Sequence, residues 1–172
     1  MHKLSDRFNF KFVGILSIAA FSAFSCLFAT TVSGQSLELK KAQKEIDPGI
    51  ATYKSEIIEK CGDFKFEMTV DYNSFSPIPE RIGLVNSQGL MQVRNALRAI
   101  CTNSSRTSER DEDAATAVRS KVKSIVITNI DDPKKKTVTL SKEGVLTVMS
   151  SFSTPAGVLD HVAIRKQLTG ML

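Results

Sequence analysis

Apolar residues recur at helical spacing in four parts of the chain. The first part begins at Asp47, an N-cap residue followed by proline, and runs to about Lys60, and the second covers residues 87–101. A third begins near Ser108, where acidic side chains fill the first turns, and a fourth covers residues 154–168. The spacing therefore predicts four helices.

Alternation of apolar and polar residues predicts strands elsewhere. Residues 64–71 alternate strictly, which is typical of a half-buried strand. Residues 124–130, 137–140 and 145–150 are rich in β-branched side chains and are separated by short turns. Strands joined by short turns usually form an antiparallel meander, so the last three are expected to pair in chain order.

Together these elements predict one α+β domain over residues 47–172, with the order α-β-α-α-β-β-β-α. Amphipathic strands need their apolar face buried, so the helices are expected to cover one face of a roughly four-stranded, mainly antiparallel sheet. The chain has 172 residues, enough for one core and too few for two.

The N-terminus has the pattern of a targeting segment. Basic residues within the first eleven positions precede an uncharged stretch over residues 12–29. Small residues before Gln35 fit cleavage there, so residues 1–34 are predicted to be a signal peptide and residues 35–46 a polar connecting segment. An uncleaved membrane anchor formed by residues 12–29 is the alternative. Lipidation of Cys26 is disfavoured, because apolar residues flank that cysteine on both sides.

Two cysteines remain once the leader is removed. An even pair in an exported chain predicts a disulfide between Cys61 and Cys101. The alternative is a nucleophilic or redox thiol, but neither cysteine belongs to a C-x-x-C pair and His161 lies far away in sequence. The pair therefore favours a periplasmic or extracellular location.

Charge argues against a nucleic-acid partner. The formal net charge is +5, and subtracting the three basic residues and one acidic residue that precede Gln35 leaves +3. A clustered basic face is expected in nucleic-acid-binding proteins. Only Lys134, Lys135 and Lys136 form a dense basic run, at a predicted turn. Such a run is typical of a soluble charged tip, or else it contacts an anionic surface component.

The segment from Tyr72 to Ile82 is apolar, proline-rich and long. Its side chains Tyr72, Phe75 and Ile78 either form a recognition surface or fold over the end of the core, and the second interpretation is favoured.

Catalytic and metal-binding patterns are weak in this sequence. His161 stands beside Asp160, but neighbours on a helix point in different directions and do not form an acid–base pair. No nucleophile elbow is present, and one histidine with two paired cysteines is too few ligands for zinc. Contiguous Asp111, Glu112 and Asp113 do not converge as an EF-hand loop does. No cofactor or metal is predicted.

These observations favour an exported, non-enzymatic binding module for a protein or cell-envelope partner, contacted through the Tyr72–Ile82 loop or a sheet edge. Two alternatives stay open. One is a small hydrolase that uses His161, and the other is a structural envelope component anchored by an uncleaved leader.

Overall fold

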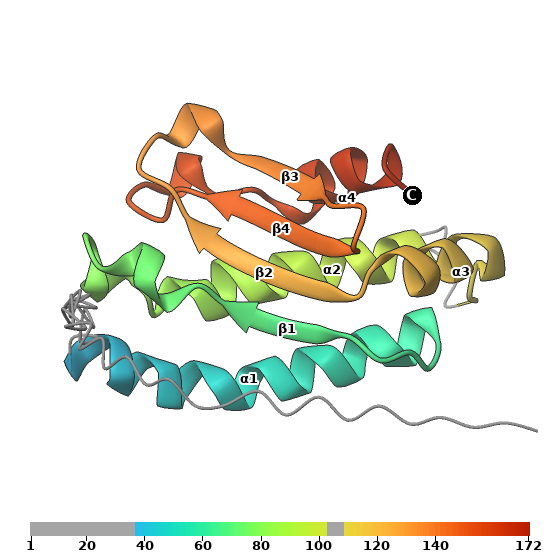
Figure 1. Ribbon diagram of the computed structural model, residues 1–172, viewed down its shortest axis with the longest axis horizontal. Coiled ribbons are helices and arrows are strands. Elements are labelled where there is room, and N and C mark those ends of the chain that lie inside the picture. The colour runs from blue at the N-terminus through green and yellow to red at the C-terminus, as the bar shows by residue number, and fades with distance from the viewer. Residues whose placement is uncertain (1–36, 103–108) are drawn as a thin grey trace, which may run out of the picture. The chain divides into compact units, whose positions relative to one another are not determined.

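Four strands form a single sheet in the computed structural model, which describes residues 37–102 and 109–172 (Figure 1). The predicted signal peptide, its cleavage site and Cys26 lie outside the described residues. The strands are β1 (Glu67–Val70), β2 (Ser124–Asn129), β3 (Thr137–Leu140) and β4 (Val145–Ser150). Their spatial order is β1-β2-β4-β3, so the last three do not pair in chain order.

The sheet is mixed, and the expectation of a mainly antiparallel meander is wrong. β1 pairs with β2 in parallel, β2 pairs with β4 in parallel, and only β3 and β4 are antiparallel. The turn at Gly144 explains the arrangement. The carbonyl oxygen of Gly144 accepts hydrogen bonds from the amides of Lys123 (2.8 Å) and Ser124 (3.2 Å), which bind the start of β4 to the start of β2. β3 is thereby displaced to the outer edge.

Glycine is required in this turn. Gly144 has φ +89°, and a Cβ atom there would lie 2.6 Å from the backbone oxygen of Lys121. Other residues rarely adopt this conformation, and none could approach the Lys121 carbonyl so closely.

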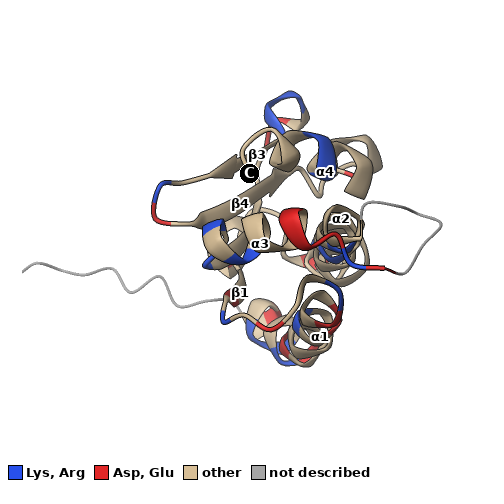
Figure 2. Ribbon diagram, turned by 90° about the vertical axis from the view of Figure 1, so that its right-hand side faces the viewer, with Lys and Arg blue, Asp and Glu red and all other residues tan. Residues whose placement is uncertain are grey.

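Helices cover one face of the sheet, as the sequence predicts. They are α1 (Leu37–Cys61), α2 (Met91–Cys101), α3 (Glu112–Lys121) and α4 (His161–Thr169). Figures 1 and 2 show α1, α2 and α4 side by side behind the sheet, while α3 lies at one end of it. The core fills the space between the two layers.

Helix α1 is longer than predicted. It begins at Leu37, ten residues before the expected N-cap Asp47, and Pro48 lies inside it. The part of the predicted connecting segment from residue 37 onward is therefore helical. Leu39 and Ile46 explain the extension, since both are buried and continue the apolar face that a helix needs. Burying them outweighs the one backbone hydrogen bond that proline removes.

The other helices begin later than predicted. Asp111 caps α3 and Asp160 caps α4, each by accepting a hydrogen bond from a backbone amide three residues on. Thr154 and Pro155 begin a 3₁₀ turn (Pro155–Gly157) instead of the last helix. Short 3₁₀ and π-helical segments of this kind stand between several of the main elements, so the predicted order of elements is incomplete.

The strands bury alternate side chains against the helices. The sheet's contribution to the core comes from one face, whose buried residues are Met68, Val70, Ile125, Ile127, Val138, Leu146 and Val148. On the opposite face, Val126, Thr147 and Met149 are half-buried, and no described helix packs over them (Figure 2).

A side chain from α4 closes the outer edge of β3. The side-chain oxygen of Gln167 accepts a hydrogen bond from the backbone amide of Val138 at 2.9 Å. β3 pairs with β4 on its other side only, so this amide points away from the sheet.

None of the helices in the described ranges is both long enough and apolar enough to cross a membrane.

Candidate ligand-binding site

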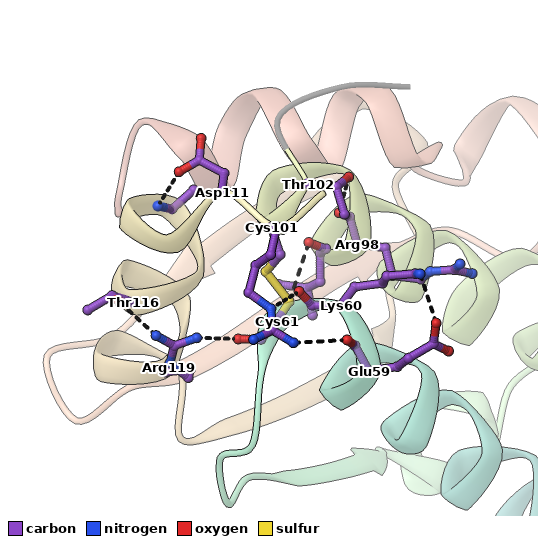
Figure 3. Close-up of a disulfide and its surroundings, with 12 residues drawn as sticks. Glu59, Lys60, Cys61, Arg98, Cys101, Thr102, Asp111, Thr116 and Arg119 are labelled. Atoms are coloured by element: carbon purple, nitrogen blue, oxygen red, sulfur yellow. Dashed lines mark hydrogen bonds and ion pairs between the residues drawn. A yellow bond between two sulfur atoms is a disulfide. The ribbon is translucent and has the colours of Figure 1, made fainter. Parts of the chain in front are cut away.

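The predicted disulfide is present. Cys61 ends α1 and Cys101 ends α2, and their sulfur atoms are bonded with a Cα–Cα distance of 5.0 Å (Figure 3). Both residues are fully buried. A sulfur atom in a buried disulfide is not a nucleophile, so the bridge is structural. It is compatible with an oxidising location outside the cytoplasm.

Two arginines reinforce the same end of α1. Arg119 donates a hydrogen bond to the carbonyl oxygen of Cys61 at 2.6 Å, and Arg110 donates to those of Lys60 (2.9 Å) and Glu59 (3.2 Å). The last carbonyls of a helix lack partners within the helix, and cationic side chains there stabilise its negative end. Figure 3 shows Arg119 reaching this end from α3. The covalent bond and these contacts together fix α1 to α2 and α3.

The Tyr72–Ile82 loop folds over the core. Tyr72 is 8% exposed, Phe75 is 0% exposed, and the Phe75 ring lies 5.2 Å from that of Phe152. Ile78 is half-buried and packs against the same core. The favoured interpretation of this loop is confirmed. The side chains of Tyr72 and Phe75, which the binding hypothesis assigned to a recognition surface, are buried in this structure.

Tyr72 also anchors the loop to α1. Its hydroxyl donates a hydrogen bond to a carboxylate oxygen of Asp47 at 2.7 Å. Burial raises the pKa of Tyr72 well above its ordinary value of 10.0, and the hydrogen bond and negative charge of Asp47 raise this pKa further.

A buried asparagine ties together the segments that follow two of the strands. Asn129, at the end of β2, donates from its side chain to the carbonyl oxygen of Ser74 at 3.0 Å, and its backbone amide donates to the hydroxyl of Ser74. Its side-chain oxygen accepts from the amide of Phe152 at 3.0 Å. The loop after β1 and the loop after β4 are therefore both held by Asn129.

The three lysines of the basic run differ in their surroundings. Lys134 and Lys135 are exposed, and Lys135 lies 3.9 Å from Asp132. Lys136 is half-buried, and its ammonium donates to the carbonyl oxygen of Ala156 at 2.6 Å, with that of Val158 at 3.5 Å. Of these three lysines, only Lys136 lines a hollow in the protein surface.

A hollow of about 380 Å³ opens beside Lys136. We call it the Gln–Lys hollow. Its polar lining consists of Gln88, Gln92, Lys136 and Asp160, and its apolar lining includes Pro155 and Leu159. Gln88 lies in the π-helical turn before α2 (Val85–Leu90), and Gln92 lies in the first turn of α2.

The Gln–Lys hollow lies at the carboxyl ends of the parallel strands. The 3₁₀ turn (Pro155–Gly157) follows β4, and Lys136 directly precedes the antiparallel β3, so both lie at the edge where β4 ends, on the left of Figure 1. In open α/β sheets, ligands bind in the crevice outside the carboxyl ends of the strands. Hollows of similar size exist elsewhere, but the one lined by Lys123, Leu140 and Gly144 lies at the opposite edge.

His161 contacts Gln92, one of the residues that line the Gln–Lys hollow. Its backbone amide donates to the side-chain oxygen of Gln92 at 3.0 Å, and its Nδ1 atom lies 3.3 Å from the same oxygen. Within residues 37–102 and 109–172, the Gln92 side chain is the partner of the imidazole, and no serine or carboxylate oxygen is hydrogen-bonded to it. The hydrolase hypothesis needs such a group.

Among the described residues, histidine, cysteine, aspartate and glutamate side chains form no cluster of three that could hold a metal ion. Asp111, the first residue of the acidic run, instead caps α3 through the backbone amide of Ala114 at 3.0 Å.

Gln88 and Gln92 were not identified from the sequence. Their spacing of four residues places both on one face of a helix, which is the only signal that could have pointed to them. Side-chain amides do not titrate, and these two belong to no catalytic or metal-binding motif. Their proximity to Lys136 depends on the mixed sheet, which local patterns did not predict.

No protein-family model, curated protein or solved structure is similar enough to match this chain. The function is therefore inferred from the residues of the site.

Proposed function

We propose that the chain is an exported, non-enzymatic binding module whose ligand occupies the Gln–Lys hollow. The observation that carries this proposal is the convergence of Gln88, Gln92 and Lys136 on one hollow at the carboxyl edge of the sheet. Binding sites are typically concave and largely apolar, with a few placed polar groups that fix orientation. A volume of about 380 Å³ is within the range of small-ligand sites.

Two further features support export and binding. The basic and then apolar N-terminal sequence is the pattern of a secretory leader, and the Cys61–Cys101 disulfide is compatible with an oxidising compartment. The imidazole of His161 contacts the amide of Gln92, a group that neither takes up nor releases protons near neutral pH. This arrangement suits a binding site better than acid–base chemistry.

Export is tested by intact mass spectrometry of the protein purified from its native host. We expect a mass that begins at or near Gln35, with Cys61 and Cys101 alkylated only after reduction. A mass that retains the leader would indicate a membrane anchor instead. Free thiols would argue against an oxidising location.

Binding is tested by native mass spectrometry after incubation with an extract of the host compartment. We expect a non-covalent adduct on the wild-type protein that is lost from the double variant Gln88→Leu/Gln92→Leu. Gln43→Leu, a matched change on α1, should retain it. An extract that adds no mass to the wild type, or the same mass to the double variant, would contradict binding in the Gln–Lys hollow.

A further inference from the structure

Several hydrogen-bond donors that line the Gln–Lys hollow have no partner among the described residues. The side-chain oxygen of Gln92 is already occupied by the backbone amide of His161, so its NH₂ group is left to donate. Gln88 has no side-chain hydrogen bond to any residue that the structure describes. Lys136 has three N–H donors, and its two contacts at Ala156 and Val158 leave one unused.

Lys136 also carries a positive charge that lacks an ionic partner. No carboxylate of the described residues lies within ion-pair distance of its ammonium, whereas neighbouring Lys135 pairs with Asp132. The carbonyls of Ala156 and Val158 hold the ammonium in place through their dipoles but do not neutralise it. A half-buried, fixed and unpaired cation beside a hollow attracts an anion more strongly than a free surface lysine does.

We propose that the ligand of the Gln–Lys hollow presents a carboxylate, which accepts hydrogen bonds from Lys136, Gln88 and Gln92. This inference rests on the proposed function and adds the chemical class of the ligand. One monovalent cation with neutral amide donors matches the single charge of a carboxylate. A phosphate carries more charge and is usually held by several cations or by a cluster of backbone amides.

Asp160 is the one acidic side chain in the lining, and its carboxylate interacts mainly with the N-terminus of α4. One of its carboxylate oxygens accepts from the backbone amide of Ala163 at 2.8 Å, and the residue caps the positive end of α4. Asp160 is exposed, so water screens its effect on an anion bound at Lys136.

The apolar lining indicates what is attached to the carboxylate. Pro155 and Leu159 offer no charged group, so the part of a small ligand that lies against them is apolar. Two sources share this chemistry, namely a free organic acid and the C-terminal carboxylate of a peptide.

The test compares matched probes by NMR titration of the purified protein in its exported form. Two pairs of probes each compare a carboxylate with its neutral amide: benzoate with benzamide, and N-acetyl-Ala-Leu with its C-terminal amide. Inorganic phosphate is the fifth probe. We expect shifts in the side-chain amide signals of Gln88 and Gln92, and affinity for each carboxylate at least about tenfold above that for its neutral amide. Tighter binding of benzoate would indicate a free acid, and tighter binding of the peptide would indicate a chain terminus.

Variants assign the charge to Lys136. Lys136→Met should lower carboxylate affinity at least about tenfold, Lys136→Arg should retain most of it, and the exposed control Lys134→Met should leave it unchanged. Because Lys136→Met also removes a contact to the loop before α4, Gln88→Leu is a second variant that breaks no described contact, and it should lower affinity as well.

The outcomes separate this inference from the proposed function. Amides that bind in the hollow as tightly as carboxylates would overturn the carboxylate assignment and leave the binding function intact. Phosphate that binds more tightly than every carboxylate would do the same. Absence of any shift at Gln88 and Gln92 would also overturn the assignment, while the native-mass experiment decides the binding function independently.

Discussion

The two ends of the sheet are built in different ways. At the end where the parallel strands begin, a disulfide joins α1 to α2, and Arg110 and Arg119 satisfy the last carbonyls of α1. At the end where those strands finish, Asn129 holds the loops, and Lys136 and Gln88 keep unused donors beside a hollow.

Under the proposed binding function, this difference separates the residues that stabilise the fold from those that contact a ligand. Polar groups near the disulfide are paired with other groups of the protein, so they have little capacity left for a ligand. Polar groups in the Gln–Lys hollow are positioned by the fold but incompletely paired. Changes at the first end should therefore lower the free energy of unfolding, and changes in the hollow should lower ligand affinity with little effect on stability.

The largest effect is expected from removal of the disulfide. The double variant Cys61→Ala/Cys101→Ala opens a loop with a sequence separation of 40, and should lower the free energy of unfolding by about 4 kcal/mol in the chain-entropy model. Urea unfolding followed by circular dichroism measures the difference. The folded variant should still bind carboxylate probes. A loss of binding in the folded variant would show that the two ends are coupled.

Asn129→Ala should have the next largest effect. The change leaves the carbonyl oxygen of Ser74 and the amide of Phe152 without their partner in a buried region, which should lower the free energy of unfolding by about 2–3 kcal/mol. Asn95→Ala, on a half-buried position of α2, is the matched control. Equal effects of the two substitutions in urea unfolding would contradict the role given to Asn129.

Arg119→Met should lower the free energy of unfolding by about 1–2 kcal/mol. It removes the donor to the Cys61 carbonyl and the contact with Glu112, and leaves a helix end partly unsatisfied. Arg165→Met, at an exposed position of α4, controls for the loss of charge. If both variants unfold at the same urea concentration, the arginine does not stabilise the end of α1.

Tyr72→Phe should have the smallest effect, about 1 kcal/mol near neutral pH, because it removes one hydrogen bond to Asp47. The pKa of Tyr72 is raised above 10.0 in the folded protein. Folding therefore favours the neutral form of Tyr72. The contribution of this residue to the free energy of unfolding is fully present below about pH 10 and decreases as the pH rises further. Thermal unfolding from pH 8 to 11 should show the advantage of the wild type over Tyr72→Phe narrowing above about pH 10. A constant difference would contradict this.

Local patterns predicted the elements of the fold better than their arrangement. β3 and β4 lie where alternation and β-branched residues placed them, and α2 ends at Cys101 as predicted. Alternation determines which face of a strand is buried, but it does not specify the neighbouring strand. The parallel pairing of β2 with β4 depends on the backbone contact of Gly144 with Lys123 and Ser124, which no local pattern contains.

The candidate site was predicted only in part. Lys136 was selected because it belongs to a run of three lysines. The run alone does not show which of these lysines lines the hollow. Only tertiary structure distinguishes Lys136, whose ammonium is fixed by Ala156, from Lys134, which is exposed. The disulfide was predictable because two cysteines remain outside the predicted leader, and two cysteines allow one intramolecular pairing.

The contact between Gln167 and the amide of Val138 has a consequence for self-association. An uncapped edge strand offers its backbone to strands of other molecules and can begin aggregation. Here a side chain of the same molecule occupies the amide of Val138, one of the donors on β3 that an incoming strand would use. Gln167→Leu would free that donor without removing a core residue, and would make the protein more prone to form intermolecular sheets at high concentration.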